Sequence, residues 1–173
     1  YKRQAVHHDR ARLDSVELLP FKRYIYDGYA GVMTGHLYVP ALDKARNKPV
    51  SMSRAVVTDL LQKELGFRGL CFTDALAMKG ATTRKSDNPS VMALLAGNDI
   101  LLAPTAPIND FAAVKEALEE GILDREEIEV KIIKILQYKY IAGLNDYRPV
   151  ETKGLSERLN SPHAAWLASL IHI

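Results

Sequence analysis

The sequence has one cysteine, Cys71, among 173 residues, and no long hydrophobic run. A single thiol cannot form a disulfide within the chain, and Cys71 stands among apolar residues, so we expect a buried thiol and not a nucleophile. No apolar stretch is long enough to span a bilayer, and no signal peptide opens the chain. We therefore expect a soluble protein, and the sequence does not distinguish the cytoplasm from the periplasm.

The chain also has no excess of charge of one sign. It carries 23 Lys and Arg against 21 Asp and Glu, a net charge of +2. Basic pairs such as Lys22-Arg23 are typical of solvated faces, so we predict no nucleic-acid partner. Neither an HExxH motif nor paired cysteines occur, so we predict no metal and no other cofactor. With 47% hydrophobic residues, the length suits a single domain with a sizeable core.

Short apolar runs alternate with helical patterns, which is typical of strand–helix units in a parallel sheet. Polar residues 82–89 are expected to form a loop at an active-site rim. The pattern predicts strands at 31–35, 69–73 and 99–103, and helices at about 20–27, 53–65, 91–96, 108–120, 124–143 and 164–170. Ser53 and Asp124 are expected to cap two of these helices, and Gly66 and Gly97 to end two of them. The expected fold class is α/β, with three strand–helix units and trailing helices from about residue 124.

The most informative segment is 66–80, Gly-Phe-Arg-Gly-Leu-Cys-Phe-Thr-Asp-Ala-Leu-Ala-Met-Lys-Gly. It places Asp74 where a short apolar strand ends. Barrel and open α/β enzymes present catalytic groups at the carboxyl ends of their strands. An aspartate in this position can equally cap a helix by accepting backbone N–H bonds. The spacing leaves both roles open.

Segment 66–80 resembles the nucleophile segment of glycoside hydrolase family 3, especially its β-N-acetylglucosaminidases. Further segments resemble the family in the same order: Leu-Asp-Ser-Val-Glu-Leu-Leu-Pro-Phe at 13–21, Val-Met-Thr-Gly-His at 32–36, Ser-Met-Ser at 51–53, and Ala-Gly-Asn-Asp-Ile-Leu-Leu at 96–102. The resemblance implies a (β/α)8 TIM barrel, which needs about 250 residues. Residues 1–173 would be the C-terminal portion of one such barrel, with about its last three βα units.

The same resemblance implies retaining hydrolysis of a terminal β-linked N-acetylglucosamine from a glycan or glycoside. Asp74 would attack the sugar and form a covalent glycosyl-enzyme. Met78 would wall the sugar subsite, or else face the core as a helix residue. His36, near the sugar pocket, would either bind the substrate or hold a loop through hydrogen bonds.

The family's Lys-His-Phe-Pro-Gly-His-Gly-Asp-Thr loop, which supplies the acid/base His-Asp pair, does not occur in the sequence. It would lie upstream of Tyr1. His7-His8-Asp9 lacks the Pro-Gly frame of that loop, so we interpret it as a simple connection. Two alternatives to an enzyme segment follow: a non-catalytic fragment or interaction module of the same ancestry, and a metal-dependent barrel enzyme using these histidines, His36 and Asp74.

Three parallel strands would leave two unpaired edges, and such edges recruit partners. We therefore expect the chain to bind the other half of a barrel or to self-associate. The barrel-facing surface is predicted to contain Val32, Leu70, Phe72, Ile100 and Leu102.

Overall fold

The computed structural model describes residues 4–46, 48–81 and 87–170. Of the predicted rim loop, residues 82–86 lie outside these ranges. The chain divides into two compact units, residues 1–137 and 138–173. In its described ranges, no helix is both long and apolar enough to cross a membrane.

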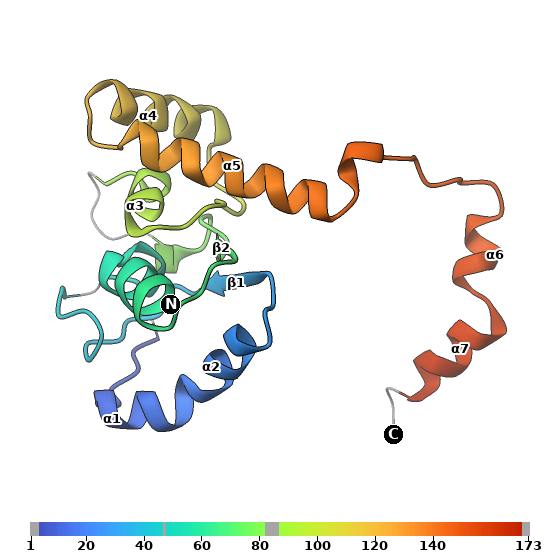
Figure 1. Ribbon diagram of the computed structural model, residues 1–173, viewed down its shortest axis with the longest axis horizontal. Coiled ribbons are helices and arrows are strands. Elements are labelled where there is room, and N and C mark those ends of the chain that lie inside the picture. Colours follow the sequence, from blue (N-terminus) through green and yellow to red (C-terminus); the bar gives the residue numbers. More distant parts are fainter. Residues whose placement is uncertain (1–3, 47, 82–86, 171–173) are drawn as a thin grey trace. The chain divides into compact units, whose positions relative to one another are not determined.

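The first unit is built on two parallel strands that lie side by side, β1 (Gly31–Thr34) and β2 (Leu70–Thr73), paired from Gly31 with Leu70 to Thr34 with Thr73 (Figure 1). Helices flank them throughout. Before β1 come α1 (Arg10–Arg12), η1 (Leu13–Glu17) and α2 (Leu19–Tyr26); between the strands come η2 (Val50–Met52) and η3 (Ala55–Glu64); after β2 come η4 (Lys79–Ala81), α3 (Pro89–Ala96), α4 (Pro107–Glu119) and α5 (Arg125–Ile141). This is a mixed α/β unit, mostly helical, with a small parallel sheet, as the alternating pattern predicted.

The second unit contains η5 (Leu144–Asp146), α6 (Leu155–Leu159) and α7 (Pro162–Ser169). The Ser161 hydroxyl accepts the Ala164 N–H and so caps α7. The sequence pattern predicted only one helix here, close to α7. The short helix α6 was missed because its five residues give too little periodicity to recognise.

The predicted third strand is reduced to a single bridge, in which Ile100 pairs with β2. Side chains replace the backbone partners that a longer ladder needs. The Asp99 carboxylate accepts the Cys71 N–H at 2.8 Å, and the Leu102 N–H donates to the Thr73 hydroxyl at 2.9 Å. The segment still runs beside β2, since the Thr73 N–H donates to the Ile100 carbonyl. The predicted position of residues 99–103 beside β2 is confirmed, but the prediction that they form a full strand is wrong.

The core lies between the sheet and its covering helices. Val32 and Cys71, paired across the strands, face this core with Val57 and Leu61 of η3. Side chains alternate along a strand, so the neighbour of Val32, Met33, points the other way and is 58% exposed. The prediction that Val32 belongs to the barrel-facing surface was therefore wrong, and Met33 occupies that surface.

Local signals set several helix ends. Gly66 and Gly97 take left-handed conformations, with φ of +74° and +112°, after η3 and α3. The Asp124 carboxylate accepts the Glu126 N–H at 2.7 Å at the start of α5, as predicted. The predicted cap at Ser53 is wrong, because its hydroxyl instead donates to Asp43.

Candidate functional site

Asp74 lies directly after β2 and continues the parallel pairing of the sheet. Its backbone N–H donates to the Thr34 carbonyl at 2.9 Å, one step beyond the last ladder pair. Asp74 and Phe72 are two residues apart, so they share the face of the sheet opposite to Cys71 and the helix-covered core. The half-buried Asp74 side chain thus belongs to the open face, at the carboxyl end of the strand.

The helix-cap alternative for Asp74 is wrong. Its Oδ1 atom accepts the N–H of the next residue, Ala75, at 2.7 Å, whereas an N-cap accepts from two or three residues further on. Residues 75–78 form turns, and the following helical turn, η4, starts only at Lys79. Helix capping, the structural alternative to a chemical role for Asp74, is therefore excluded.

His36 is buried behind the loop that follows Asp74. Its Nε2 lies 3.0 Å from the Ala75 carbonyl oxygen, and its Nδ1 lies 2.7 Å from the Ser51 hydroxyl. A carbonyl oxygen only accepts, so we assign the proton to Nε2, and Nδ1 accepts from Ser51. Both ring nitrogens bind the protein itself, an arrangement that favours the loop-holding role over direct contact with substrate.

Met78 lies in the turn after Asp74 and is 48% exposed. Its backbone N–H donates to the Ala75 carbonyl, and its carbonyl accepts from Ala81, so the backbone is fixed while the side chain points outward. The alternative that Met78 is a helix residue facing the core is therefore wrong.

Sequence reasoning missed Asn98, which is fully buried and joins three elements. Its Oδ1 accepts the Thr34 hydroxyl at 2.7 Å, and its Nδ2 donates to the carbonyls of Ser51 at 2.7 Å and Ala93 at 2.8 Å. An asparagine between a helix-ending glycine and an apolar run is the signal that could have found it. Buried amides in such places are held by partners.

Ala103 has a φ of +42°, in the left-handed region that favours glycine. Its carbonyl accepts the Ala77 N–H at 3.0 Å, which ties it to the loop after Asp74. Backbone outliers of this kind gather at functional sites. The observation places local strain at the same end of the sheet as Asp74.

A buried ion pair supports β2 from α5. Lys134 Nζ lies 2.7 Å from Asp99 Oδ2, and the Asp99 side chain is only 1% exposed. The same oxygen accepts the Cys71 N–H. Burial raises the pKa of the Cys71 thiol, consistent with the predicted inert cysteine.

His7-His8-Asp9 has a structural use. The Asp9 carboxylate accepts the Arg12 N–H at 2.7 Å and caps α1, and both histidines are exposed. Among the residues that the structure describes, no three His, Cys, Asp or Glu side chains come together as metal ligands.

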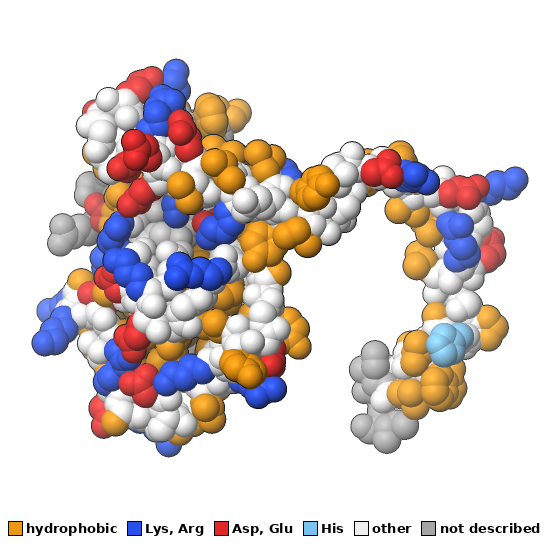
Figure 2. All heavy atoms as spheres, viewed as in Figure 1, with side chains coloured by type: hydrophobic (Ala, Val, Ile, Leu, Met, Phe, Trp, Pro, Cys, Tyr) orange, Lys and Arg blue, Asp and Glu red, His pale blue; other side chains and the backbone are white. Residues whose placement is uncertain are grey.

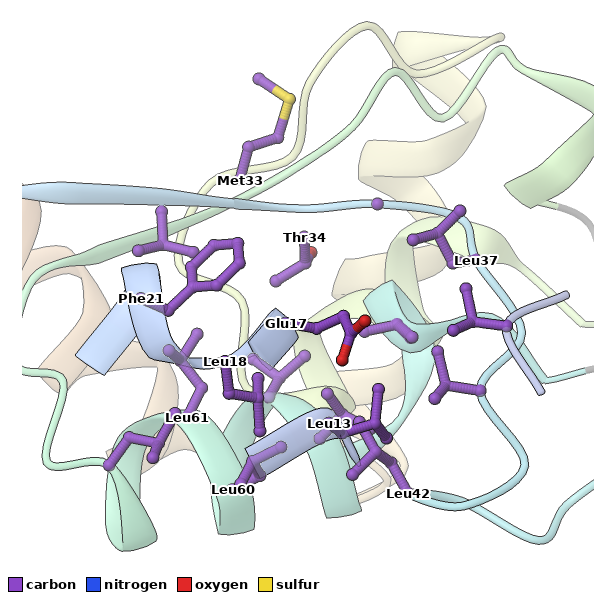
Figure 3. A pocket seen from close by; sticks show the side chains of 18 residues that line it. Leu13, Glu17, Leu18, Phe21, Met33, Thr34, Leu37, Leu42, Leu60 and Leu61 are labelled. Carbon is purple, nitrogen blue, oxygen red and sulfur yellow. The ribbon is translucent and has the colours of Figure 1, made fainter. Parts of the chain in front are cut away.

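An apolar cavity of about 290 Å³ lies on the helix side of β1 (Figure 3). Glu17 points its carboxylate into it among leucine side chains; Oε1 pairs with Arg12 at 3.0 Å, while the buried Oε2 has no hydrogen-bond partner. Burial alone would raise the pKa of Glu17, but hydrogen bonds from Arg12 and its own backbone, with the charges of Arg12 and His8, hold that pKa below its ordinary value. Asp74 and Met78 do not line this cavity, so we assign it to packing between β1 and its helices.

Surface charge is mixed around the first unit. In Figure 2, Lys and Arg side chains are interspersed with Asp and Glu over the visible face. Several pairs are in contact, among them Lys63 with Asp59 on η3. Long-range attraction of one kind of charged partner is not favoured by such a surface.

Residues 1–138 match the model of the glycosyl hydrolase family 3 N terminal domain. The beta-hexosaminidase A of Pseudoalteromonas piscicida is 32% identical in an alignment 154 residues long, and the match covers 78% of this chain and 26% of that protein. A solved family 3 beta-N-acetylglucosaminidase from Paenibacillus sp. str. FPU-7 is 31% identical with a TM-score of 0.75, covering 85% of this chain and 28% of that one. A beta-glucoside phosphorylase structure, at 24% identity, has a TM-score of 0.84 over 94% of this chain and 31% of its own, and shows the fold alone.

These comparisons confirm the resemblance found in the sequence segments. The chain spans about a quarter of the length of the Pseudoalteromonas relative, whose match covers 26% of that protein. Its strands and helices are accordingly part of a family barrel domain. Because the domain model covers residues 1–138 of 173, the chain belongs to glycoside hydrolase family 3.

Proposed function

We propose that this chain supplies the nucleophile of a retaining β-N-acetylglucosaminidase, and that Asp74 is that nucleophile. The observation that carries the proposal is the position of Asp74: the carboxyl end of β2, on the face opposite the core, and free of a helix-capping role. The substrate class is proposed from the membership of the chain in family 3 and from its similarity to β-N-acetylglucosaminidases: a glycan or glycoside ending in β-linked N-acetylglucosamine.

In the proposed reaction, a carboxylate oxygen of Asp74 forms a bond to the anomeric carbon as the bond to the leaving oxygen breaks. A general acid gives the leaving oxygen its proton. Water then attacks the glycosyl-enzyme ester, loses a proton to the same group acting as base, and releases Asp74. Met78, exposed four residues after Asp74, would wall the sugar subsite. His36 would hold the loop between them.

The acid/base group is proposed to come from a barrel half outside these residues. Within the described ranges, Asp9 is engaged as a helix cap and His36 binds protein atoms through both nitrogens. General acid–base help is worth roughly 10² to 10⁴ in rate. The chain alone is therefore expected to be a poor hydrolase. Among the described residues, the edge of β1 away from β2 has no ladder partner, and such an edge favours association with a partner.

The experiment joins this chain to the N-terminal barrel half of a family 3 β-N-acetylglucosaminidase and measures hydrolysis of an aryl β-N-acetylglucosaminide by release of the aryl alcohol. Asp74→Asn should lower turnover by roughly 10³-fold or more, since the covalent step is lost. Asp59→Asn, which changes an exposed carboxylate on η3, is the matched control and should leave turnover unchanged. A loss below about tenfold in Asp74→Asn would contradict the proposal.

A non-catalytic role is the second candidate, favoured by the absence of a free His-Asp pair in the described residues. It predicts that the joined protein binds N-acetylglucosamine or a partner without turnover. A turnover above that of the barrel half alone would exclude it.

A further inference from the structure

We propose that Asn98 is a positioning residue for Asp74, and that it acts through Ser51 and His36. The inference rests on the proposed function, because it gives Asn98 a part in orienting the nucleophile. Its basis is a closed ring of six hydrogen bonds. From Asp74 to Ser51, the Asp74 N–H donates to Thr34 O (2.9 Å), Thr34 Oγ1 to Asn98 Oδ1 (2.7 Å), and Asn98 Nδ2 to Ser51 O (2.7 Å). The ring then returns as Ser51 Oγ donates to His36 Nδ1 (2.7 Å), His36 Nε2 to Ala75 O (3.0 Å), and the Ala75 N–H to Asp74 Oδ1 (2.7 Å).

The ring holds the backbone on both sides of the Asp74 side chain. On the amino side, the Asp74 N–H is bound by Thr34 of β1. On the carboxyl side, the Ala75 carbonyl is bound by His36. The first bond fixes the peptide group before Asp74, and the second fixes the peptide group after Ala75. The peptide group between them donates its N–H to the Asp74 carboxylate itself, so the direction of that carboxylate is set by the held backbone on both sides.

Asn98 is the member that no other residue type replaces. Its oxygen accepts one bond and its two amide hydrogens go to separate carbonyls, those of Ser51 and Ala93. Aspartate would keep the acceptor and lose both donors, and leucine would lose all three. Because Asn98 is fully buried, water cannot substitute from bulk solvent. Without the Asn98 amide, the Ser51 backbone would be free to move, and His36, which is held by the Ser51 hydroxyl, would move with it.

The chain of contacts has little freedom because its members are packed. Thr34, His36, Ser51 and Asn98 are all buried. A Cβ on Gly80 would stand 3.1 Å from the His36 Cβ, so the histidine is also confined from the side of η4. Displacement of a reacting group by about 1 Å can lower a rate by about 10²-fold.

The test compares Asn98→Ala and Ser51→Ala in the complete 173-residue chain. Ser51→Ala removes one hydroxyl from the ring and serves if Asn98→Ala fails to fold. Thr58→Val is the matched control, since the buried Thr58 hydroxyl also donates to a carbonyl of α3, that of Ala96 at 2.8 Å, and lies outside the ring.

The first measurement is the imidazole nitrogen NMR spectrum of His36. In the parent chain and in Thr58→Val we expect a single tautomer protonated at Nε2, with slow exchange of that proton. In both ring variants we expect mixed tautomers or fast proton exchange. Unchanged His36 signals in the folded ring variants would overturn the inference.

The second measurement is the kinetics of the same variants in the joined enzyme. We expect kcat to fall by about 10²-fold in Asn98→Ala with KM within about twofold, and no change in Thr58→Val. Unchanged kcat in a variant whose His36 signals have changed would also overturn the inference. If the parent joined enzyme has no turnover, the proposed function has failed, whereas the His36 spectra still decide whether Asn98 controls the loop.

Discussion

Replacing Lys134 by methionine should remove a large part of the stability of the first unit. Lys134 Nζ lies 2.7 Å from Asp99 Oδ2, with side chains 23% and 1% exposed, and it also donates to the Gly69 carbonyl. Methionine keeps most of the apolar stem and removes the charge. The Asp99 carboxylate is then left buried without its cation, with the Cys71 N–H still donating to it.

Removing one partner of a buried pair is destabilising by about 3–5 kcal/mol. Lys134 is partly exposed, so we expect the lower end, about 3 kcal/mol. Domains of this size are stable by about 5–15 kcal/mol in total. The variant should therefore unfold at a clearly lower urea concentration than the parent chain.

Urea unfolding followed by circular dichroism gives the free energy of unfolding by linear extrapolation. Lys115→Met is the matched control, because Lys115 pairs with Glu119 on α4 with both side chains 67% exposed, and such pairs contribute about 0.3–0.5 kcal/mol. The double variant Asp99→Asn with Lys134→Met removes the unpaired charge and should recover most of the loss. A loss below about 1 kcal/mol in Lys134→Met, or no recovery in the double variant, would refute the reasoning.

Three further predictions concern the core and its loops. Gly69→Ala should lower the free energy of unfolding by about 1–3 kcal/mol in urea titrations, because its Cβ would overlap the Ala30 carbonyl oxygen. Cys71 should react with a chromogenic disulfide reagent far more slowly in the native chain than in urea, because it is fully buried and burial raises its pKa. Burial alone would raise the pKa of Asp43, but hydrogen bonds from Ser53 and a backbone N–H, with the charge of a nearby lysine, hold that pKa below its ordinary value. The ionised Asp43 carboxylate therefore stabilises the folded chain above about pH 3.9, and this contribution is lost as the pH falls through the lowered pKa. Asp43→Asn should consequently flatten the fall in the free energy of unfolding below about pH 4.

The predictions for Gly69 and Asp43 each have a control variant. Gly35→Ala adds a Cβ whose nearest neighbour is 3.7 Å away and should change stability by less than about 0.5 kcal/mol. Asp59→Asn, at an exposed carboxylate, should leave the pH dependence of unfolding as it is in the parent chain. Equal effects in variant and control would contradict the corresponding prediction, and rapid labelling of Cys71 in the native chain would contradict the second.

The helix ends and the place of Asp74 could be predicted from the sequence because their signals are local. Glycine at Gly66 and Gly97 takes a backbone conformation that other residues avoid, and Asp124 caps its own helix. Asp74 follows an apolar run directly, so its position at a strand end needs no distant information.

The third strand could not be predicted because distant side chains decide its pairing. Asp99 takes the N–H of Cys71, and Thr73 takes the N–H of Leu102, 29 residues away. Strand alternation likewise distinguishes two faces for Val32 and its neighbours without telling which one the helices cover.

The support of the candidate site was also hidden by sequence distance. In the sequence, Ser51 comes 15 residues after His36, and Asn98 comes 47 residues after Ser51. Each is an ordinary polar residue by itself, and their common burial is visible only once the helices are packed. A polar residue next to an apolar run, as Asn98 is, is the sequence signal that points to such a network.

The central claim is that the Asp74 carboxylate forms the covalent glycosyl-enzyme. The most direct measurement treats the joined enzyme with a fluorinated N-acetylglucosaminide that slows breakdown of this intermediate, and maps the labelled peptide by mass spectrometry. We expect the sugar on Asp74, and no label in Asp74→Asn. A label on any other carboxylate, or an equal label in Asp74→Asn, would contradict the account.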